Sequence, residues 1–326
     1  MKNLRSAKKR SVRADDFPLD WHVLGGTSGA ALAKQTAALL GLSSAPIRVE
    51  HFPDGELKPQ LPGSVADMRV ILVQPTPPPV NDNLVELLLS IDALVENGAR
   101  QVVAVVPYLG YSRQNTRASV GDPVSARVVI DAIQERGAAA IIAVDLHDPA
   151  LTRLASIPFL NVRVESAMAE CIANMLPARR DLVVVAPDEG GRERALVVGA
   201  KLGTPTLVLE KERRRADGDA RCTSNRPPGD AADGKIAVVV DDMITTGNTL
   251  LAAARAVRQI GSSAVAAVCT HGIFCEGAVS QLECADFLSI AVSDSVPIVP
   301  SSAVTQAFSV AQLIAEAILK VAEQLE

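Results

Sequence analysis

The chain has 326 residues, of which 48% are hydrophobic and 21% are charged, and its formal net charge is −5 at pH 7. This length exceeds what one hydrophobic core usually fills, and the apolar content is enough for two cores, so we expect two globular domains. Because only 3% of the residues are aromatic and the net charge is negative, the composition argues against a nucleic-acid-binding protein. The five cysteines are odd in number and form no Cys-x-x-Cys pair, which favours reduced thiols and a cytoplasmic location.

The first residues are strongly basic, with no acid before Asp15. We interpret residues 1–20 as a disordered basic tail, with a transit peptide as the alternative, although the segment lacks the amphipathic pattern of one. No segment has the character of a membrane span, because the longest uncharged run, residues 295–315, contains Pro297 and Pro300.

Short runs rich in Val and Ile alternate with segments of helical spacing. Consecutive β-branched residues are typical of parallel strands that are buried on both faces, so this alternation predicts an α/β fold. The predicted helices cover residues 84–96, 124–136, 192–201 and 249–260, and glycines such as Gly98, Gly137 and Gly261 end them. The predicted strands cover residues 47–52, 70–74, 102–106, 141–145, 182–186, 206–209, 236–241, 265–270 and 287–292.

A break in this series near residues 160–165 separates two similar halves. We therefore predict two doubly wound, mainly parallel-sheet domains, at residues 21–163 and 164–326, and we expect the last helix to pack back on the first domain. Residues 210–235 form one long irregular segment, and a loop of that length is either functional or disordered.

The most informative segment connects the predicted strand 236–241 to the helix 249–260. It places two acids, Asp241 and Asp242, before a turn rich in Thr and Gly. Such a turn presents backbone N–H groups and hydroxyls to an anion, and the dipole of the following helix favours negative charge. Two carboxylates beside it suit a sugar diol or a hydrated Mg²⁺ ion. The segment therefore predicts a sugar-phosphate site, and a plain strand–turn–helix with solvated acids is the alternative.

This segment resembles the PRPP-binding motif of the type I phosphoribosyltransferases. In that superfamily the paired acids hold the ribose hydroxyls and the following loop holds the 5-phosphate. The resemblance implies ribose 5-phosphate-binding roles for Asp241, Asp242, Thr245, Thr246, Gly247, Asn248 and Thr249.

Further segments, in the same order along nearly the whole chain, resemble the ribose-phosphate diphosphokinase family. Residues 52–56 are similar to its adenine-binding segment, which crosses a subunit boundary there, and residues 107–114 are similar to its ATP-contacting turn. Residues 145–149, 186–191 and 209–213 resemble its metal-binding turn, its second ligand loop and its mobile catalytic loop. The resemblance implies that Phe52, Asp54, Glu56, Arg113 and Gln114 bind ATP, that His147 and Asp188 bind metal, and that Lys211 and Arg213 are catalytic.

The implied activity is Mg²⁺-dependent transfer of the diphosphoryl group of ATP to the C1 hydroxyl of ribose 5-phosphate, which yields PRPP and AMP. The resemblance also implies a homo-oligomer, either a dimer or a hexamer, with no nucleic-acid or membrane partner. Two alternatives stay open: a phosphoribosyltransferase that consumes PRPP, and a non-catalytic regulatory subunit. The first shares residues 241–249 but needs no second domain, and the retained Lys211 and Arg213 argue against the second. The chain departs from many members of the family at Thr245, where they have Asp.

Overall fold

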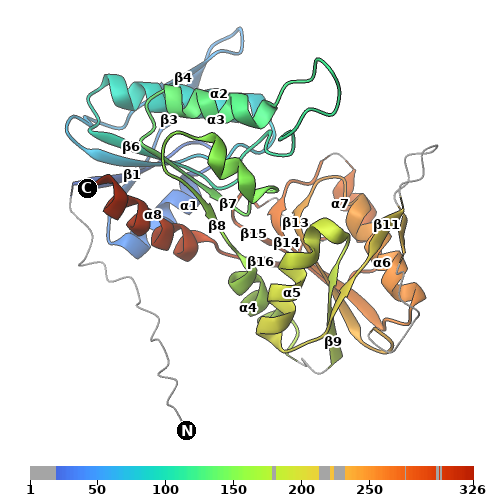
Figure 1. Cartoon of the computed structure of the whole chain (residues 1–326). Helices are drawn as coiled ribbons and strands as arrows, with labels where there is room; N and C mark the ends of the chain where they lie inside the picture. The colour runs from blue at the N-terminus through green and yellow to red at the C-terminus, as the bar shows by residue number, and fades with distance from the viewer. Residues whose placement is uncertain are drawn as a thin grey trace.

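The computed structural model describes residues 20–177, 181–212, 221–223, 232–275, 277–298, 301 and 303–326, with only the backbone described at 211–212 and 221–223. Two α/β units lie next to each other, and each is built around its own sheet (Figure 1). In the described part of the chain, no helix is both long enough and apolar enough to cross a membrane.

The sheet of the first unit has six strands, and every neighbouring pair in it is parallel. The central strands are buried over their whole length, as the runs of β-branched residues predict. The spatial order is β2 (Ser44–Pro46), β1 (Trp21–Gly25), β5 (Arg69–Val73), β6 (Gln101–Val106), β7 (Ala140–Val144) and β8 (Phe159–Val162).

The sheet of the second unit is also six-stranded and parallel throughout. When strands are numbered within each sheet, both sheets have the order 2-1-3-4-5-6. The predicted pair of similar, doubly wound parallel sheets is therefore confirmed. The spatial order is β10 (Thr206–Val208), β9 (Leu182–Ala186), β13 (Ile236–Ile244), β14 (Ala264–Gly272), β15 (Ser289–Ser293) and β16 (Gln306–Phe308).

Helices cover both faces of each sheet, because their apolar stripes need a buried surface. In the first unit α1 (Ala30–Leu40) packs on one face, and α2 (Val80–Glu96) and α3 (Ser125–Glu135) pack on the other. In the second unit α4 (Glu165–Met175) and α5 (Arg192–Leu202) pack opposite α6 (Asn248–Gln259) and α7 (Ala278–Glu283).

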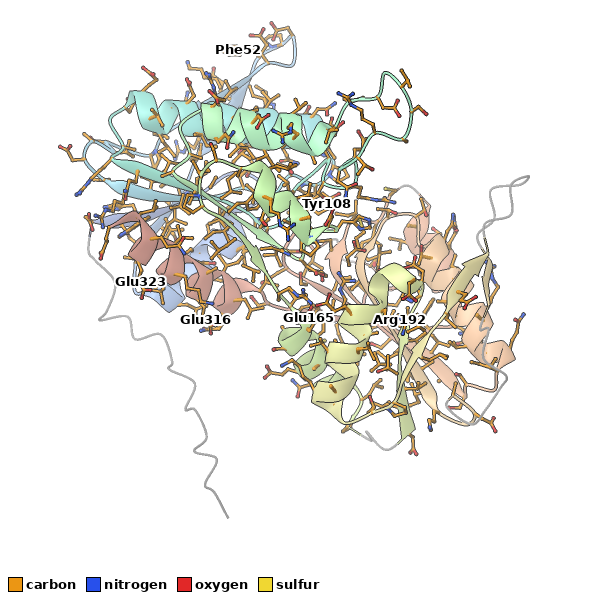
Figure 2. All side chains as sticks on the ribbon, viewed as in Figure 1. Phe52, Tyr108, Glu165, Arg192, Glu316 and Glu323 are labelled. Carbon is orange, nitrogen blue, oxygen red and sulfur yellow. The ribbon has the colours of Figure 1, made fainter. Side chains whose placement is uncertain are left out.

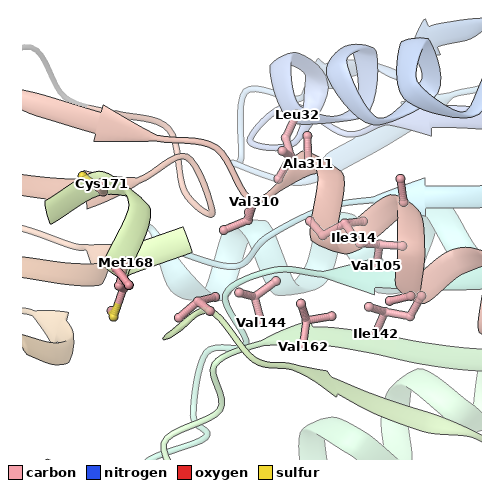
Figure 3. Packing of buried hydrophobic residues seen from close by; sticks show 14 of the residues in the cluster. Leu32, Val105, Ile142, Val144, Val162, Met168, Cys171, Val310, Ala311 and Ile314 are labelled. Atoms are coloured by element: carbon pink, nitrogen blue, oxygen red, sulfur yellow. The ribbon is translucent and has the colours of Figure 1, made fainter. Parts of the chain in front are cut away.

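The helix α8 (Ala311–Leu325) follows the second sheet in the chain but packs beside α1 on the first sheet (Figure 1). Its residues Ile314 and Ile318 are fully buried in a cluster that contains Val105 and Ile142 of the first sheet (Figure 3). Gln101 Nε2 donates a hydrogen bond to the carbonyl oxygen of Leu325 at 3.1 Å. The same cluster continues into α4 and α5, so one apolar core runs through both units.

Two sequence predictions are wrong in this region of the fold. The predicted strand at residues 47–52 is not part of a parallel sheet. Instead, β3 (Arg48–His51) pairs antiparallel with β4 (Leu57–Gln60) in a separate, largely exposed hairpin. The segment 210–235 is not wholly irregular, because β11 (Glu210–Glu212) pairs antiparallel with β12 (Arg221–Thr223). The glycines that were predicted to end helices have the left-handed backbone conformation of helix C-termini, with positive φ at Gly98, Gly137 and Gly261.

Candidate active site at the junction of the two units

The order of the second sheet reverses between β9 and β13. In doubly wound sheets, ligands bind beyond the carboxyl ends of the strands at this reversal. Two of the predicted segments lie there, since Asp188 follows β9, and the acid–threonine segment begins in β13 and leads into α6. Sheet topology therefore brings together residues that are far apart in the sequence.

The two acids lie within the strand, because β13 continues to Ile244, beyond the predicted end at residue 241. The backbone N–H of Asp242 donates to Asp241 Oδ1 at 2.9 Å. Burial, together with the charge of Asp242, raises the pKa of Asp241 well above its usual value. Burial also tends to raise the pKa of Asp242, but hydrogen bonding to His147 and the charge of Arg194 outweigh that effect and lower it to about 2. The two carboxylates therefore have pKa values that are pushed apart, and Asp242 carries the negative charge.

The turn after β13 has the form that the sequence predicts. Gly247 has a φ of 80°, and a Cβ atom placed on it would lie 3.2 Å from Leu282 Cγ, so a glycine is favoured there by conformation and by space. The next residue, Asn248, begins α6, so the N-terminus of that helix lies at this turn. Thr246 and Asn248 are exposed, while Thr245 and Thr249 are half-buried. The hydroxyl-bearing side of the turn is thus accessible to an anion.

His147 comes from the other unit, in the turn after β7. Its Nδ1 lies 2.6 Å from Asp242 Oδ2, and its side chain is 47% exposed. The hydrogen bond to Asp242 raises the pKa of His147, while burial and the positive charges of Arg113 and Arg194 oppose the rise. This contact joins the predicted metal-binding turn to the predicted sugar-phosphate segment.

A buried ion pair lies behind this contact. Arg194 Nη2, from α5, donates to Asp145 Oδ1 at 3.0 Å, and the two side chains are 13% and 5% exposed. Neither residue is among those to which the sequence resemblance gives a role. An Arg in the first turn of a helix resembles a solvated side chain, so the only available signal was the position of Asp145 directly after a buried strand.

The predicted ATP-contacting turn follows β6 and faces the same junction. Arg113 is exposed, and its charge influences both Tyr108 and His147, so it lies near them. Burial raises the pKa of Tyr108, and the charge of Arg113 opposes that rise. Gln114 is held by Ser125, whose Oγ donates to Gln114 Oε1 at 2.5 Å. The charge of Arg113 is therefore near His147, on the side of the first unit.

The predicted metal ligands do not form a complete site by themselves. Asp188 Oδ1 accepts a hydrogen bond from Gly191 N at 3.3 Å, within its own turn. Among the described side chains, no three His, Cys, Asp or Glu residues gather into a possible metal site. This arrangement still fits Mg²⁺, which usually keeps several waters and takes one or two carboxylates together with substrate phosphates. The half-exposed His147 and Asp188 leave room for such ligands.

Other predicted residues are not brought to the junction within one chain. Phe52, Asp54 and Glu56 lie at the tip of the β3–β4 hairpin, where Glu56 N donates to Asp54 Oδ1 at 3.1 Å. Figure 2 shows Phe52 at a projecting end of the first unit, away from Tyr108. Lys211 lies on β11 with only its backbone described, and Arg213 lies outside the described residues.

The equivalent crevice of the first unit, between β1 and β5, is filled by the protein itself. Glu86 is 3% exposed and accepts hydrogen bonds from Thr27 N at 2.7 Å and from Thr27 Oγ1 at 2.5 Å. A Cβ atom on Gly26 would lie 2.1 Å from Gln74 Oε1. A carboxylate of the protein therefore takes the place that an anion would take, and the two like sheets differ in this respect.

Comparison with known proteins agrees with this geometry. A model of the N-terminal domain of ribose phosphate pyrophosphokinase matches residues 21–137, and a phosphoribosyl transferase domain model matches residues 150–282. The chain is 38% identical to a ribose-phosphate pyrophosphokinase of Methanopyrus kandleri, over 84% of this chain and 92% of the relative. It is 35% identical to ribose-phosphate pyrophosphokinase 1 of Spinacia oleracea, over 95% of this chain and 92% of the relative.

A solved structure shares the whole fold. The crystal structure of phosphoribosylpyrophosphate synthetase from Mycobacterium smegmatis matches with a TM-score of 0.83 and 29% identity, over 93% of this chain and 99% of that one. The match spans both units rather than one of them. The chain belongs to the ribose-phosphate pyrophosphokinase family.

Proposed function

We propose that the protein is a ribose-phosphate diphosphokinase, which transfers the diphosphoryl group of Mg-ATP to the C1 hydroxyl of ribose 5-phosphate and yields PRPP and AMP. The observation that carries this proposal is the contact between His147 of one unit and Asp242 of the other, with Nδ1 and Oδ2 2.6 Å apart. A reaction between two bound substrates needs their binding groups held together. At this contact the predicted metal-binding turn of the first unit and the sugar-phosphate segment of the second meet.

Ribose 5-phosphate binds in this proposal beyond β13. Asp241 and Asp242 accept hydrogen bonds from the ribose hydroxyls, and the helix N-terminus after Gly247 favours the charge of the 5-phosphate. The exposed side of the turn supports this orientation. The phosphate contacts come from the backbone and side chains of Thr245, Thr246, Gly247, Asn248 and Thr249.

ATP binds on the side of the first unit. Arg113 is always charged and pairs with phosphate oxygens, and Gln114 lies next to it. The hairpin residues Phe52, Asp54 and Glu56 are exposed, and Figure 2 shows Phe52 away from the junction of its own chain, which supports adenine binding in the site of a second copy. The protein is therefore proposed to be a homo-oligomer, a dimer or a hexamer.

His147 and Asp188 are the residues that would hold Mg²⁺, which supplies charge neutralisation for the triphosphate. The C1 hydroxyl oxygen attacks the β-phosphorus of ATP and forms a new P–O bond. The bond between the β-phosphorus and the oxygen that links it to the α-phosphorus breaks, and AMP leaves with that oxygen. The proton of the hydroxyl passes to solvent. Lys211 and Arg213 stabilise the charge that is shared between the attacking and leaving oxygens.

The test is to incubate the purified protein with Mg-ATP and ribose 5-phosphate and to measure AMP and PRPP by ion-exchange chromatography and phosphorus NMR. We expect the two products in equal amounts. The matched control is the double variant Asp241→Asn/Asp242→Asn, which we expect to lose PRPP formation.

The rival functions give different results. Release of pyrophosphate from PRPP and a nucleobase would identify a phosphoribosyltransferase. A protein that is inactive alone but changes the rate of an active homologue would be a regulatory subunit. Absence of AMP from folded protein, under conditions that preserve its oligomer, would exclude the diphosphokinase.

A further inference from the structure

His147 follows a short segment of the first unit, Val144 and Asp145, that accepts hydrogen bonds from residues of the second unit. Oδ1 of Asp145 accepts from Arg194 at 3.0 Å, and Oδ2 accepts from the Thr270 hydroxyl. The carbonyl oxygen of the preceding residue, Val144, accepts from His271 Nε2 at 3.1 Å. Thr270 and His271 are adjacent on β14. One short segment of the second unit therefore holds the end of β7 in the first.

The ring of His271 has a fixed orientation. It is 2% exposed, and burial lowers the pKa of His271, which favours the neutral ring. Because a carbonyl oxygen only accepts, the proton is on Nε2, and Nδ1 accepts from Ser295 Oγ at 2.8 Å. The ring of Tyr108 packs edge-on against it, with centroids 5.1 Å apart. The direction of the hydrogen bond to Val144 is therefore set by surrounding groups.

The backbone of Asp145 supports the same conclusion. Its φ is 47°, in the left-handed region that residues other than glycine seldom adopt. Such a conformation persists where neighbouring groups hold it, and it is frequent at functional sites. Further hydrogen bonds hold this bend from within the first unit, from Asp145 N to Val162 O and from Leu146 N to Asn161 Oδ1, both at 2.9 Å. Two residues later, His147 reaches Asp242.

We propose that Thr270 and His271 are positioning residues that align the two halves of the active site. Neither is proposed to contact a substrate. They act through Asp145 and Val144 on His147, and so on the placement of the ATP side relative to the sugar-phosphate turn. This inference rests on the proposed function, because that function assigns one substrate to each unit. Its consequence is that loss of the Thr270 hydroxyl slows turnover without weakening the binding of either substrate alone.

The experiment compares Thr270→Val with Thr270→Ser. Valine keeps the shape but removes the hydroxyl, so we expect kcat to fall on the order of tenfold to a hundredfold, as small misalignments do. The KM values for ATP and ribose 5-phosphate should change less than about threefold, because neither Thr270 nor His271 is proposed to contact a substrate. Ribose 5-phosphate should still bind with full stoichiometry in calorimetry. Serine should restore most of kcat, since it keeps the donor.

The matched control is Thr36→Val in α1. Thr36 is also fully buried, but its Oγ1 makes no hydrogen bond among the described residues, so kcat should be unchanged. A second measurement does not depend on activity. Amide hydrogen exchange in a peptide that covers residues 144–148 should be faster in Thr270→Val and should return to the wild-type rate in Thr270→Ser. The double variant Asp145→Ala/Thr270→Val should turn over at the same rate as Asp145→Ala, because the partner of the hydroxyl is already absent.

The outcomes separate the two proposals. A wild-type protein that makes PRPP, beside a Thr270→Val variant with unchanged kcat, would overturn the positioning role and leave the function intact. A loss of kcat that accompanies reduced ribose 5-phosphate stoichiometry and that serine does not repair would also overturn it. A wild-type protein that makes no PRPP, but whose exchange at residues 144–148 responds to Thr270→Val and to Thr270→Ser as expected, would overturn the function and support the positioning.

Discussion

Nδ1 of His147 lies 2.6 Å from Oδ2 of Asp242, although the two residues are 95 positions apart in the sequence and belong to different units. One side chain is nearly half exposed, and the other is almost buried. Because each residue changes the pKa of the other, this contact connects the alignment of the two units to pH.

The first prediction concerns that pH dependence. The hydrogen bond that His147 donates to Asp242 raises the pKa of His147, so its contribution to stability is complete below the unfolded value, about 6.5, and is lost as pH rises through the raised folded value. Asp242 contributes above its own unfolded value, about 3.9, and loses its contribution as pH falls toward 2. His147→Gln should therefore lower the free energy of unfolding more at about pH 6 than at about pH 8.5. The measurement is urea unfolding in the presence of EDTA.

The control is His51→Gln, which changes an exposed histidine at the end of β3. It should change stability little at either pH. An effect of His147→Gln that is equal at both pH values would show that the charged pair does not form in solution.

The second prediction concerns the buried ion pair of Arg194 and Asp145. Arg194→Met leaves a buried carboxylate without its guanidinium, which typically destabilises a protein by about 3–5 kcal/mol. Unfolding in guanidinium chloride should show this destabilisation as a lower midpoint concentration, with an unchanged dependence of the unfolding free energy on denaturant concentration. The control Arg192→Met removes an exposed arginine two positions earlier, which pairs with Glu189, and it should have little effect. Equal midpoints for the two variants would contradict the prediction.

The third prediction concerns Glu86, which fills the crevice of the first unit. Glu86→Ala removes a charged acceptor from Thr27 N and Oγ1, so we expect a loss of about 3 kcal/mol in unfolding free energy. Inorganic phosphate should restore part of the stability of this variant, because an anion can take the place of the carboxylate, whereas chloride at equal ionic strength should not. Glu96→Ala, exposed at the end of the same helix, is the control. A Glu86→Ala variant as stable as the control would show that the carboxylate is not needed there.

The fourth prediction concerns α8. Ile318 is fully buried against the first unit, so Ile318→Ala should cost about 2–5 kcal/mol in unfolding free energy, measured in urea. Glu323→Ala, on the exposed side of the same helix, should cost little. If both variants unfold at the same midpoint, the helix does not contribute to the core in the way that the contacts indicate.

The fifth prediction concerns the segment after β10. Lys211→Ala should lose most of its turnover and keep its unfolding midpoint, because a positive charge there is proposed to act mainly in the transition state. Lys201→Ala, exposed near the end of α5, is the control and should keep full turnover. Unchanged turnover in Lys211→Ala would remove this segment from the mechanism.

The fold could be predicted from the sequence where the pattern is local. Residues 102–106 are apolar at every position, which is typical of a strand covered on both faces, and the structure places such runs in the middle of the sheets. The error at residues 47–52 has a local cause as well. Apolar Ile47 and Val49 alternate with polar Arg48 and Glu50, and that period of two is typical of a half-exposed strand and not of a parallel core.

The site could be predicted only in part, for a different reason. The turn at Gly247 follows from adjacent residues, so the sequence alone indicates it. The pairing of Arg194 with Asp145, and of Thr270 with the same carboxylate, depends on how two units meet, and no local pattern encodes that. The hydrogen bonds of the His271 ring nitrogens, to Ser295 and to Val144, also join residues that are far apart in the sequence. No local pattern indicates them either.

The position of α8 also bears on how the protein is made. A ribosome synthesises the strands of the first sheet early, but the helix that covers one of its faces emerges only after all strands of the second sheet. During translation, the nascent first unit therefore exposes an apolar surface until the second unit is complete. Chaperone demand should be highest in that interval.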